Sequence, residues 1–102
     1  MINYLFFIGK IKKMPECDFF KSDNEFIVEV KRNYKNSNGV FEVDCFKCDL
    51  WYAISKKISL NCKEGDLVAV KGRLVDDNGL YKIMAEQVVL LTKNTKDEVF
   101  VV

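Results

Sequence analysis

The chain has 102 residues, of which 49% are hydrophobic, and this is the usual size of one domain with one modest core. Aromatic residues make up 13% of the chain and there is one proline, which excludes a disordered protein because such a composition offsets the entropy lost on folding. The net charge is only +1, so overall charge does not indicate nucleic-acid binding, and any basic binding surface must be local.

The apolar stretch 4–8 is too short to span a bilayer, and it lacks the basic region and small-residue cleavage site of a signal peptide. We therefore expect a cytoplasmic protein with no membrane partner. The cysteines are expected to be free thiols, because disulfides are rare in the cytosol and a chain with an ample core does not need them. They are Cys17, Cys45, Cys48 and Cys62.

Residues 3–13 predict a β-strand that is apolar on both faces in its middle. One face can turn toward the core, and it consists of Leu5, Phe7, Gly9 and Ile11. The other face places Tyr4, Phe6 and Ile8 in a strip that would be left in water. A second subunit is the expected cover, so these three residues predict an oligomer interface.

Two strands joined by a polar turn are predicted next. In residues 25–31 apolar side chains alternate with charged ones, as in a half-buried strand, and the polar residues 36–39 favour a turn. The following strand, 41–51, has a core-like face formed by Phe46, Cys48 and Leu50. Its opposite face holds the only tryptophan of the chain among charged residues, and consists of Cys45, Lys47, Asp49 and Trp51.

A short helix and two further strands complete the pattern. Residues 53–62 have apolar side chains at every fourth position, which predicts a helix with a narrow apolar stripe that caps the core. The alternating residues 68–74 and the apolar residues 80–91 predict two strands around a tight turn at 77–79.

This order of three strands, a helix and two strands predicts an all-β fold with one short helix. Gly9 and Gly72 lie inside strands, where a sheet must bend to close. The order and the glycines fit a five-stranded Greek-key barrel of the OB-fold type. We assign residues 1–91 to this domain and 92–102 to a short C-terminal extension, whose apolar end either adds an edge strand or frays.

Cys45 and Cys48 have the spacing of a metal or redox motif. On a strand, however, residues three apart point to opposite faces and cannot chelate one ion, and the chain has no histidine to complete a site. We therefore predict no metal. Glu42 and Asp44 fit a solvated strand edge, and no glycine loop that could hold a phosphate is present, so we expect no enzyme activity and no cofactor.

Four segments, in the right order and spacing, resemble the bacterial single-stranded DNA-binding proteins. The opening of the chain, with Gly9-Lys10-Ile11 followed by Pro15-Glu16, is similar to the start of that family. The other three segments resemble its third strand, its helix exit and its fourth strand, and they are residues 44–51, 63–65 and 68–74. The resemblance covers residues 1–91, nearly the whole chain.

The resemblance implies an OB barrel that acts in DNA replication, recombination or repair and assembles as a homotetramer in preference to a homodimer. It implies that the barrel binds single-stranded DNA by stacking bases on aromatic side chains and pairing phosphates with basic ones. The positions that match the family's binding residues are Trp51, Tyr34, Phe19, Lys47 and Lys10. Two further cations that could pair with the phosphates of a strand stacked on Trp51 are Lys71 and Arg73.

Some of these positions allow a second interpretation. Trp51 could instead pack against a subunit or the helix. Tyr34 has the strand parity of core-facing residues, so it reaches DNA only if the strand bulges before the turn.

The sequence departs from the family pattern at three places. Cys45 stands where many members have a large aromatic residue, which implies the loss of one stacking platform. The turn 76–79 replaces a long DNA-contacting loop and implies a smaller footprint. The acidic C-terminal tip of the family is missing, so recruitment of partner proteins by a tail is not expected.

Two alternative functions remain open. The chain also resembles primosomal replication protein N, an accessory module for replication restart. An OB module that binds protein is favoured by Asp49 beside Trp51, because a carboxylate on the binding face would repel phosphates.

Overall fold

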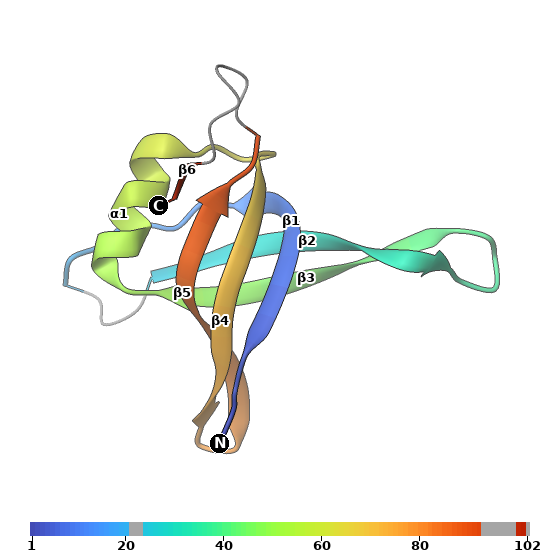
Figure 1. Cartoon of the computed structure of the whole chain (residues 1–102), viewed down its shortest axis with the longest axis horizontal. Coiled ribbons are helices and arrows are strands. Elements are labelled where there is room, and N and C mark those ends of the chain that lie inside the picture. The colour runs from blue at the N-terminus through green and yellow to red at the C-terminus, as the bar shows by residue number, and fades with distance from the viewer. Residues whose placement is uncertain (21–23, 93–99, 102) are drawn as a thin grey trace.

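A closed five-stranded barrel with a helix at one end forms the body of the molecule (Figure 1). The computed structural model describes residues 1–20, 24–92, 100 and 101. Its elements are β1 (Leu5–Lys13), β2 (Asn24–Lys35), β3 (Phe41–Leu50), α1 (Tyr52–Asn61), β4 (Leu67–Asp77), β5 (Leu80–Leu90) and β6 (Phe100–Val101). The predicted order of strands and helix is confirmed.

The barrel closes because β1 pairs with two strands and β5 returns to β3. The antiparallel neighbours of β1 are β2 and β4, and β4 forms a hairpin with β5. A short parallel pairing then joins β5 to β3, with Cys48 opposite Ile83 and Asp49 opposite Met84. This connectivity is the Greek-key barrel that the sequence predicts.

At Gly9 and Gly72 the backbone of a neighbouring strand approaches closely. A Cβ atom on Gly9 would lie 2.4 Å from the carbonyl oxygen of Glu29, and one on Gly72 would lie 2.3 Å from that of Met84. No other residue type fits at these distances without moving the neighbouring strand. Glycine is therefore needed at both positions, where the sheet was predicted to bend, because any side chain would collide with the neighbouring strand.

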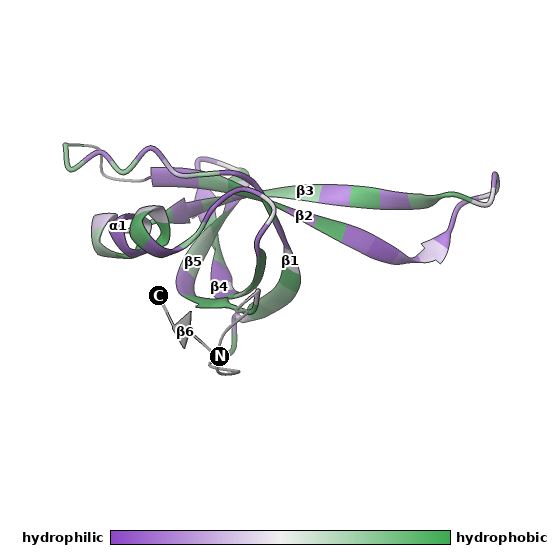
Figure 2. Ribbon diagram, turned by 90° about the horizontal axis from the view of Figure 1, so that it is seen from above, coloured by the Kyte–Doolittle hydropathy of each residue, from purple (hydrophilic) through white to green (hydrophobic). Residues whose placement is uncertain are grey.

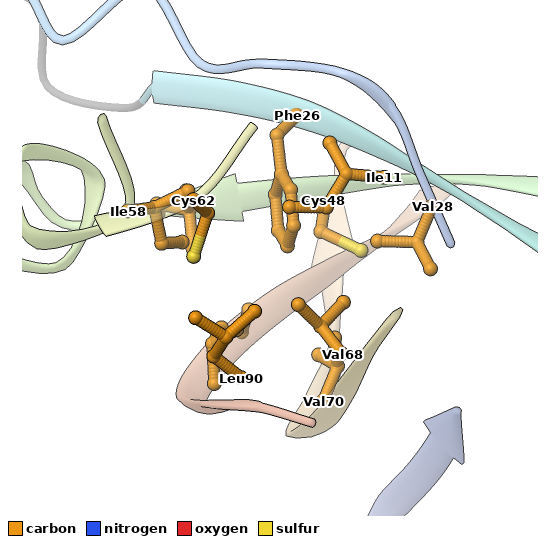
Figure 3. Packing of buried hydrophobic residues seen from close by; sticks show 12 residues of the cluster. Ile11, Phe26, Val28, Cys48, Ile58, Cys62, Val68, Val70 and Leu90 are labelled. Atoms are coloured by element: carbon orange, nitrogen blue, oxygen red, sulfur yellow. The ribbon is translucent and has the colours of Figure 1, made fainter. Parts of the chain in front are cut away.

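The core lies inside the barrel and is completed by one face of α1 (Figure 3). Alternation in the strands turns Phe26 and Val28 of β2 inward, together with Cys48 of β3 and Val68 of β4. The helix adds Ile58, and all five side chains are fully buried. The apolar stripe predicted for the helix thus closes the barrel end.

The predicted boundaries need correction at the junction between β3 and α1. The strand expected to reach Trp51 ends at Leu50, and the helix begins at Tyr52. Trp51 is still extended, with φ −69° and ψ 152°, but its carbonyl oxygen accepts hydrogen bonds from the amides of Ile54 and Ser55. Trp51 is therefore the residue that caps the helix rather than a member of the strand.

Two hairpins extend beyond the barrel. The distal part of the β2–β3 hairpin forms an arm that projects away from the body (Figures 1 and 2). The β4–β5 hairpin ends in a tight turn at Asn78 and Gly79, which both have positive φ, as a two-residue turn of type I′ requires. Because no core lies beneath these ends, the alternation between buried and exposed side chains stops there.

The chain beyond β5 is described only in part. Residues 100 and 101 form β6, which pairs with β5 as an additional strand. The rest of the predicted extension, residues 93–99 and 102, lies outside the described residues. No helix among the described residues has the length and apolar character needed to cross a membrane.

Candidate functional site

Trp51 presents its indole at the surface at the end of β3. Its backbone caps α1, but its side chain makes no capping hydrogen bond, and the residue is 47% exposed. A tryptophan that served only the core would be buried more fully. About half of the Trp51 surface is therefore accessible to a ligand.

Three aromatic rings contact one another in a row that includes Tyr52, the residue after Trp51. The ring centroid of Phe19 is 5.1 Å from that of Tyr52, the first residue of α1, and 5.7 Å from that of Phe20, both in edge-to-face geometry. Asp18 shapes this loop, because its carboxylate accepts a hydrogen bond from the amide of Phe20. Phe19 and Phe20 are both exposed, so the loop offers aromatic surface beside the helix start.

Lys10 and Lys47 lie on the outer face of the sheet formed by β1, β2 and β3. Lys10 stands opposite Glu29 of β2, which in turn stands opposite Cys45 of β3. Lys47 is two positions further along β3, on the same face as Cys45. Lys47 and Trp51 are four residues apart along the chain, and β3 ends between them at Leu50.

Asp49 also belongs to this face, but its charge is compensated. Its carboxylate lies 3.2 Å from the ammonium of Lys82 on β5, and the side chain is largely buried. The neighbouring thiol of Cys48 points into the core. Burial, with smaller effects of Asp49 and Glu25, raises the pKa of Cys48 to about 12.

Lys71 and Arg73 lie on the sheet formed by β1, β4 and β5. The ammonium of Lys71 is 5.3 Å from the ring centroid of Tyr4, and Arg73 forms an ion pair of 3.5 Å with Glu86. Lys71 therefore stands among the apolar residues expected at a subunit interface. The structure does not join it to Trp51 and Lys47, although the sequence grouped these residues together.

The predicted interface strip is present on the outer face of β1, beside β4. Tyr4, Phe6 and Ile8 all project outward from β1 and are exposed, with Phe6 at 66%. Lys71 lies directly opposite Phe6 in the β1–β4 register. The strip is thus an apolar surface with one cation beside it.

Tyr34 is exposed, contrary to what simple alternation predicts. The β2–β3 register shifts between Lys31 and Lys35, so the strand bulges before the turn, as a role in binding would require. Tyr34 lies on the projecting arm, away from the core. The presence of this bulge could not be predicted from the sequence, because the residues around it have no special turn chemistry.

An ion pair stabilises the base of the arm. The guanidinium of Arg32 approaches Asp44 at 2.8 Å, and its hydrogen bonds to this carboxylate hold the pKa of Asp44 below its usual value. Glu42 joins the same group at 3.4 Å. Glu42 and Asp44 are therefore engaged by a cation.

Phe41 is a surface residue that the sequence reasoning missed. Its ring is approached by two ammonium groups, that of Lys31 at 4.7 Å and that of Lys35 at 5.6 Å. Lys35 stands directly opposite Phe41 in the β2–β3 register. The hairpin register could have indicated this pairing, because it follows from the position of the turn.

The four cysteines are unpaired thiols, and Cys45 and Cys48 lie on opposite faces of β3 as predicted from strand parity. Cys45 is exposed, and its sulfur lies 3.6 Å from the ammonium of Lys12. Within the described part of the chain, no three cysteine, aspartate or glutamate side chains come together in a way that could hold a metal ion.

Comparison with known proteins gives matches along most of the chain. The family model described as "Single-strand binding protein family" matches residues 2–90. Single-stranded DNA-binding protein 1 of Streptococcus pyogenes serotype M18 is 33% identical over 81 residues, which are 76% of this chain and 62% of that protein. A protein of the same name in Clostridium acetobutylicum is 29% identical over 110 residues, with 95% of this chain and 98% of that protein covered.

The lengths of these relatives differ from that of the chain. The chain spans 62% of the streptococcal protein and 65% of Single-stranded DNA-binding protein 1 of Lactococcus lactis. Its match to the clostridial protein, in contrast, extends over almost the whole of that relative.

Solved structures show the same barrel. The Plasmodium falciparum SSB in complex with ssDNA superimposes with a TM-score of 0.68 at 14% identity, over 89% of this chain and 96% of that one. A deletion mutant of the single-stranded DNA binding protein from Thermus aquaticus gives a TM-score of 0.61 at 16% identity, over 87% of this chain and 56% of that one. At such identities the likeness supports the fold alone.

Proposed function

The chain belongs to the single-strand binding protein family, and from this premise we propose that it binds single-stranded DNA on the outer face of β1, β2 and β3. The observation that supports this site most strongly is the half-exposed indole of Trp51, four residues along the chain from the exposed side chain of Lys47. An unpaired base offers a face for stacking that a duplex hides, and a nearby cation pairs with phosphate. The proposed role is binding without catalysis, in the replication, recombination or repair of DNA in the cytoplasm.

The proposed DNA contacts divide into aromatic residues that stack on bases and lysines that pair with phosphates. Trp51 is the principal stacking residue, with Phe19 beside the helix start and Tyr34 on the arm as further aromatic surfaces. Lys47 and Lys10 are the cations that this face supplies. Lys71 and Arg73 are secondary, because they lie on β4, outside the face formed by β1, β2 and β3.

The surroundings of Asp49 weaken the case for a protein-binding module. An uncompensated carboxylate would repel the phosphates of a strand laid across β3. Lys82 lies 3.2 Å from Asp49, and its positive charge offsets that of the carboxylate. The feature that favoured the alternative is therefore compatible with DNA binding.

The assembly we propose buries the strip of Tyr4, Phe6 and Ile8 between subunits, in a homotetramer. An exposed apolar strip on a strand is covered most simply by a second copy of the same surface. In such an assembly Lys71 lies at the interface edge beside Tyr4.

Two substitutions test the binding face. We expect Trp51→Ala to weaken binding to oligo(dT) by about 1–3 kcal/mol with little change in salt dependence, because stacking is uncharged. Lys47→Ala should weaken binding less but lower the slope of log affinity against log salt by about 0.7. Lys57→Ala, an exposed lysine of α1, controls for the change in net charge.

The measurement is fluorescence anisotropy of a labelled strand at several salt concentrations, with the matching duplex as competitor. The duplex should compete poorly. Equal binding of strand and duplex, or Trp51→Ala affinity equal to that of the unsubstituted protein, would contradict the proposal.

A further inference from the structure

A cleft of about 350 Å³ lies beside the proposed binding face. It opens between the outer face of β2 and β3 and the tip of the β4–β5 hairpin. Glu25, Lys47 and Asp49 line one wall, and Asp77, Tyr81 and Lys82 line the other. Its volume is at the low end of the range for small-molecule sites, about 300–1,000 Å³, which suits one nucleotide-sized group.

The strand register explains how these residues meet. Glu25 stands directly opposite Asp49 in the β2–β3 pairing, and Lys47 is two positions away on the same face of β3. The parallel pairing of β3 with β5 then brings the hairpin alongside, where Lys82 reaches Asp49. Both walls are therefore fixed by the backbone pairing of the barrel.

Tyr81 gives the cleft an aromatic surface. The residue is 78% exposed and stands opposite Asp76 in the β4–β5 hairpin, beyond the part of the sheet that covers the core. Its ring makes no aromatic or cation–π contact with any other described residue. An exposed ring at the mouth of a cleft provides a stacking platform for a base.

The charges of the cleft select which part of a nucleotide enters it. Three carboxylates face two ammonium groups, and one of the carboxylates, Asp49, is already paired with Lys82. Among the described residues no hydrogen bond or ion pair engages the carboxylates of Glu25 and Asp77. These acceptors disfavour phosphate inside the cleft and favour the amino groups of bases, as carboxylates do when they accept from cytosine N4.

We propose that this cleft takes one base of the bound strand and favours a base with an exocyclic amino group over thymine. The base stacks on Tyr81, its amino group donates to Glu25, and its phosphate stays outside the cleft. Cytosine, adenine and guanine carry such a group, whereas thymine does not. This inference rests on the proposed function and adds a base preference to it.

The test compares oligo(dC) with oligo(dT) of the same length, by anisotropy, for the unsubstituted protein, Glu25→Gln and Glu29→Gln. Glu25→Gln should lower the affinity for oligo(dC) by about fivefold to tenfold relative to that for oligo(dT), because a charge-assisted hydrogen bond is lost. Glu29→Gln removes the same charge from the same face of β2, outside the cleft, and should change both affinities by one factor. Tyr81→Leu should weaken binding to both oligonucleotides.

The contrary outcomes are distinct. If Glu25→Gln changes both affinities by the same factor, its carboxylate acts only as a general charge and the proposed preference is wrong. If Tyr81→Leu leaves both affinities unchanged, the ring does not stack. If the unsubstituted protein binds neither oligonucleotide, the proposed function itself fails.

Discussion

Cys45 and Cys48 are three residues apart on one strand, yet their chemical environments are opposite. Cys45 is exposed beside Lys12, whereas Cys48 is fully buried in the core. Burial raises the pKa of Cys48 to about 12, and burial with the nearby carboxylate of Asp66 raises the pKa of Cys62 to about 11. The thiolate is the reactive form, so both buried thiols are doubly protected near neutral pH.

A thiol-labelling experiment at pH 8 should resolve these environments. We expect Cys45 to react fastest with a disulfide reagent, and Cys48 and Cys62 to react only after unfolding. Cys45→Ser should remove the fast phase and leave the protected thiols unchanged. Reaction of Cys48 at the rate of Cys45 would show that the Cys48 side chain does not point into the core.

The raised pKa values also predict the direction of a pH effect on stability. Because each folded-state pKa lies above the ordinary value of 9.0, the folded state holds these protons more tightly than the unfolded chain. This contribution is fully present below pH 9 and is lost as the pH rises toward 11 and 12. Cys48→Ala should reduce the alkaline loss of stability, measured by thermal unfolding between pH 8 and 11.

Strand parity predicted the facing of these cysteines, but it did not predict the neutralisation of Asp49. Its partner Lys82 lies 33 positions further along the chain, and only the parallel closing pair of β3 and β5 brings them together. No local sequence pattern reports such a pairing. The same closure forms the cleft beside Tyr81, which the sequence analysis also missed.

At the scale of elements, alternation predicted the strands well wherever they cover the core. It failed at Tyr34, where β2 bulges before the turn, and at Leu74, where the β4–β5 hairpin runs past the barrel, because both residues have core parity but are exposed. The sequence pattern shows which side chains share a face, but not where the barrel beneath that face ends.

The helix α1 closes the barrel and should contribute strongly to stability through one residue. Ile58 is fully buried among strand residues, so Ile58→Ala should lower the free energy of unfolding by about 2–5 kcal/mol. Leu60→Ala, on the exposed side of the same helix, controls for helix propensity and should cost less than about 0.5 kcal/mol. Urea unfolding at one protein concentration measures both, and equal effects would show that α1 does not complete the core.

At the scale of the whole molecule, the barrel has two outer surfaces of different character. One carries Trp51 and Lys47, the other carries the apolar strip of Tyr4, Phe6 and Ile8, and Lys10 follows that strip on the same face of β1. The sequence identified both sets of side chains. It assigned Lys71 to the first surface, because strand order alone does not show that β4 lies beside β1 at Tyr4.

The apolar strip predicts how the chains assemble. We expect the protein to be oligomeric at micromolar concentration and Phe6→Glu to dissociate it, because a buried carboxylate without a partner is costly. Leu60→Glu places the same charge on the exposed face of α1 and should leave the mass unchanged. Light scattering after gel filtration gives both masses, and a monomeric unsubstituted protein would contradict the proposed interface.

The measurement that tests the central claim most directly is titration of the Trp51 fluorescence with oligo(dT), because this is the only tryptophan of the chain. Stacking of a base on the indole should quench the emission in a saturable way, with the midpoint shifting to higher oligonucleotide concentration as salt is added. The matching duplex should cause little quenching. Emission that stays unchanged, with no binding by any signal even at low salt, would contradict the proposal that this surface binds single-stranded DNA.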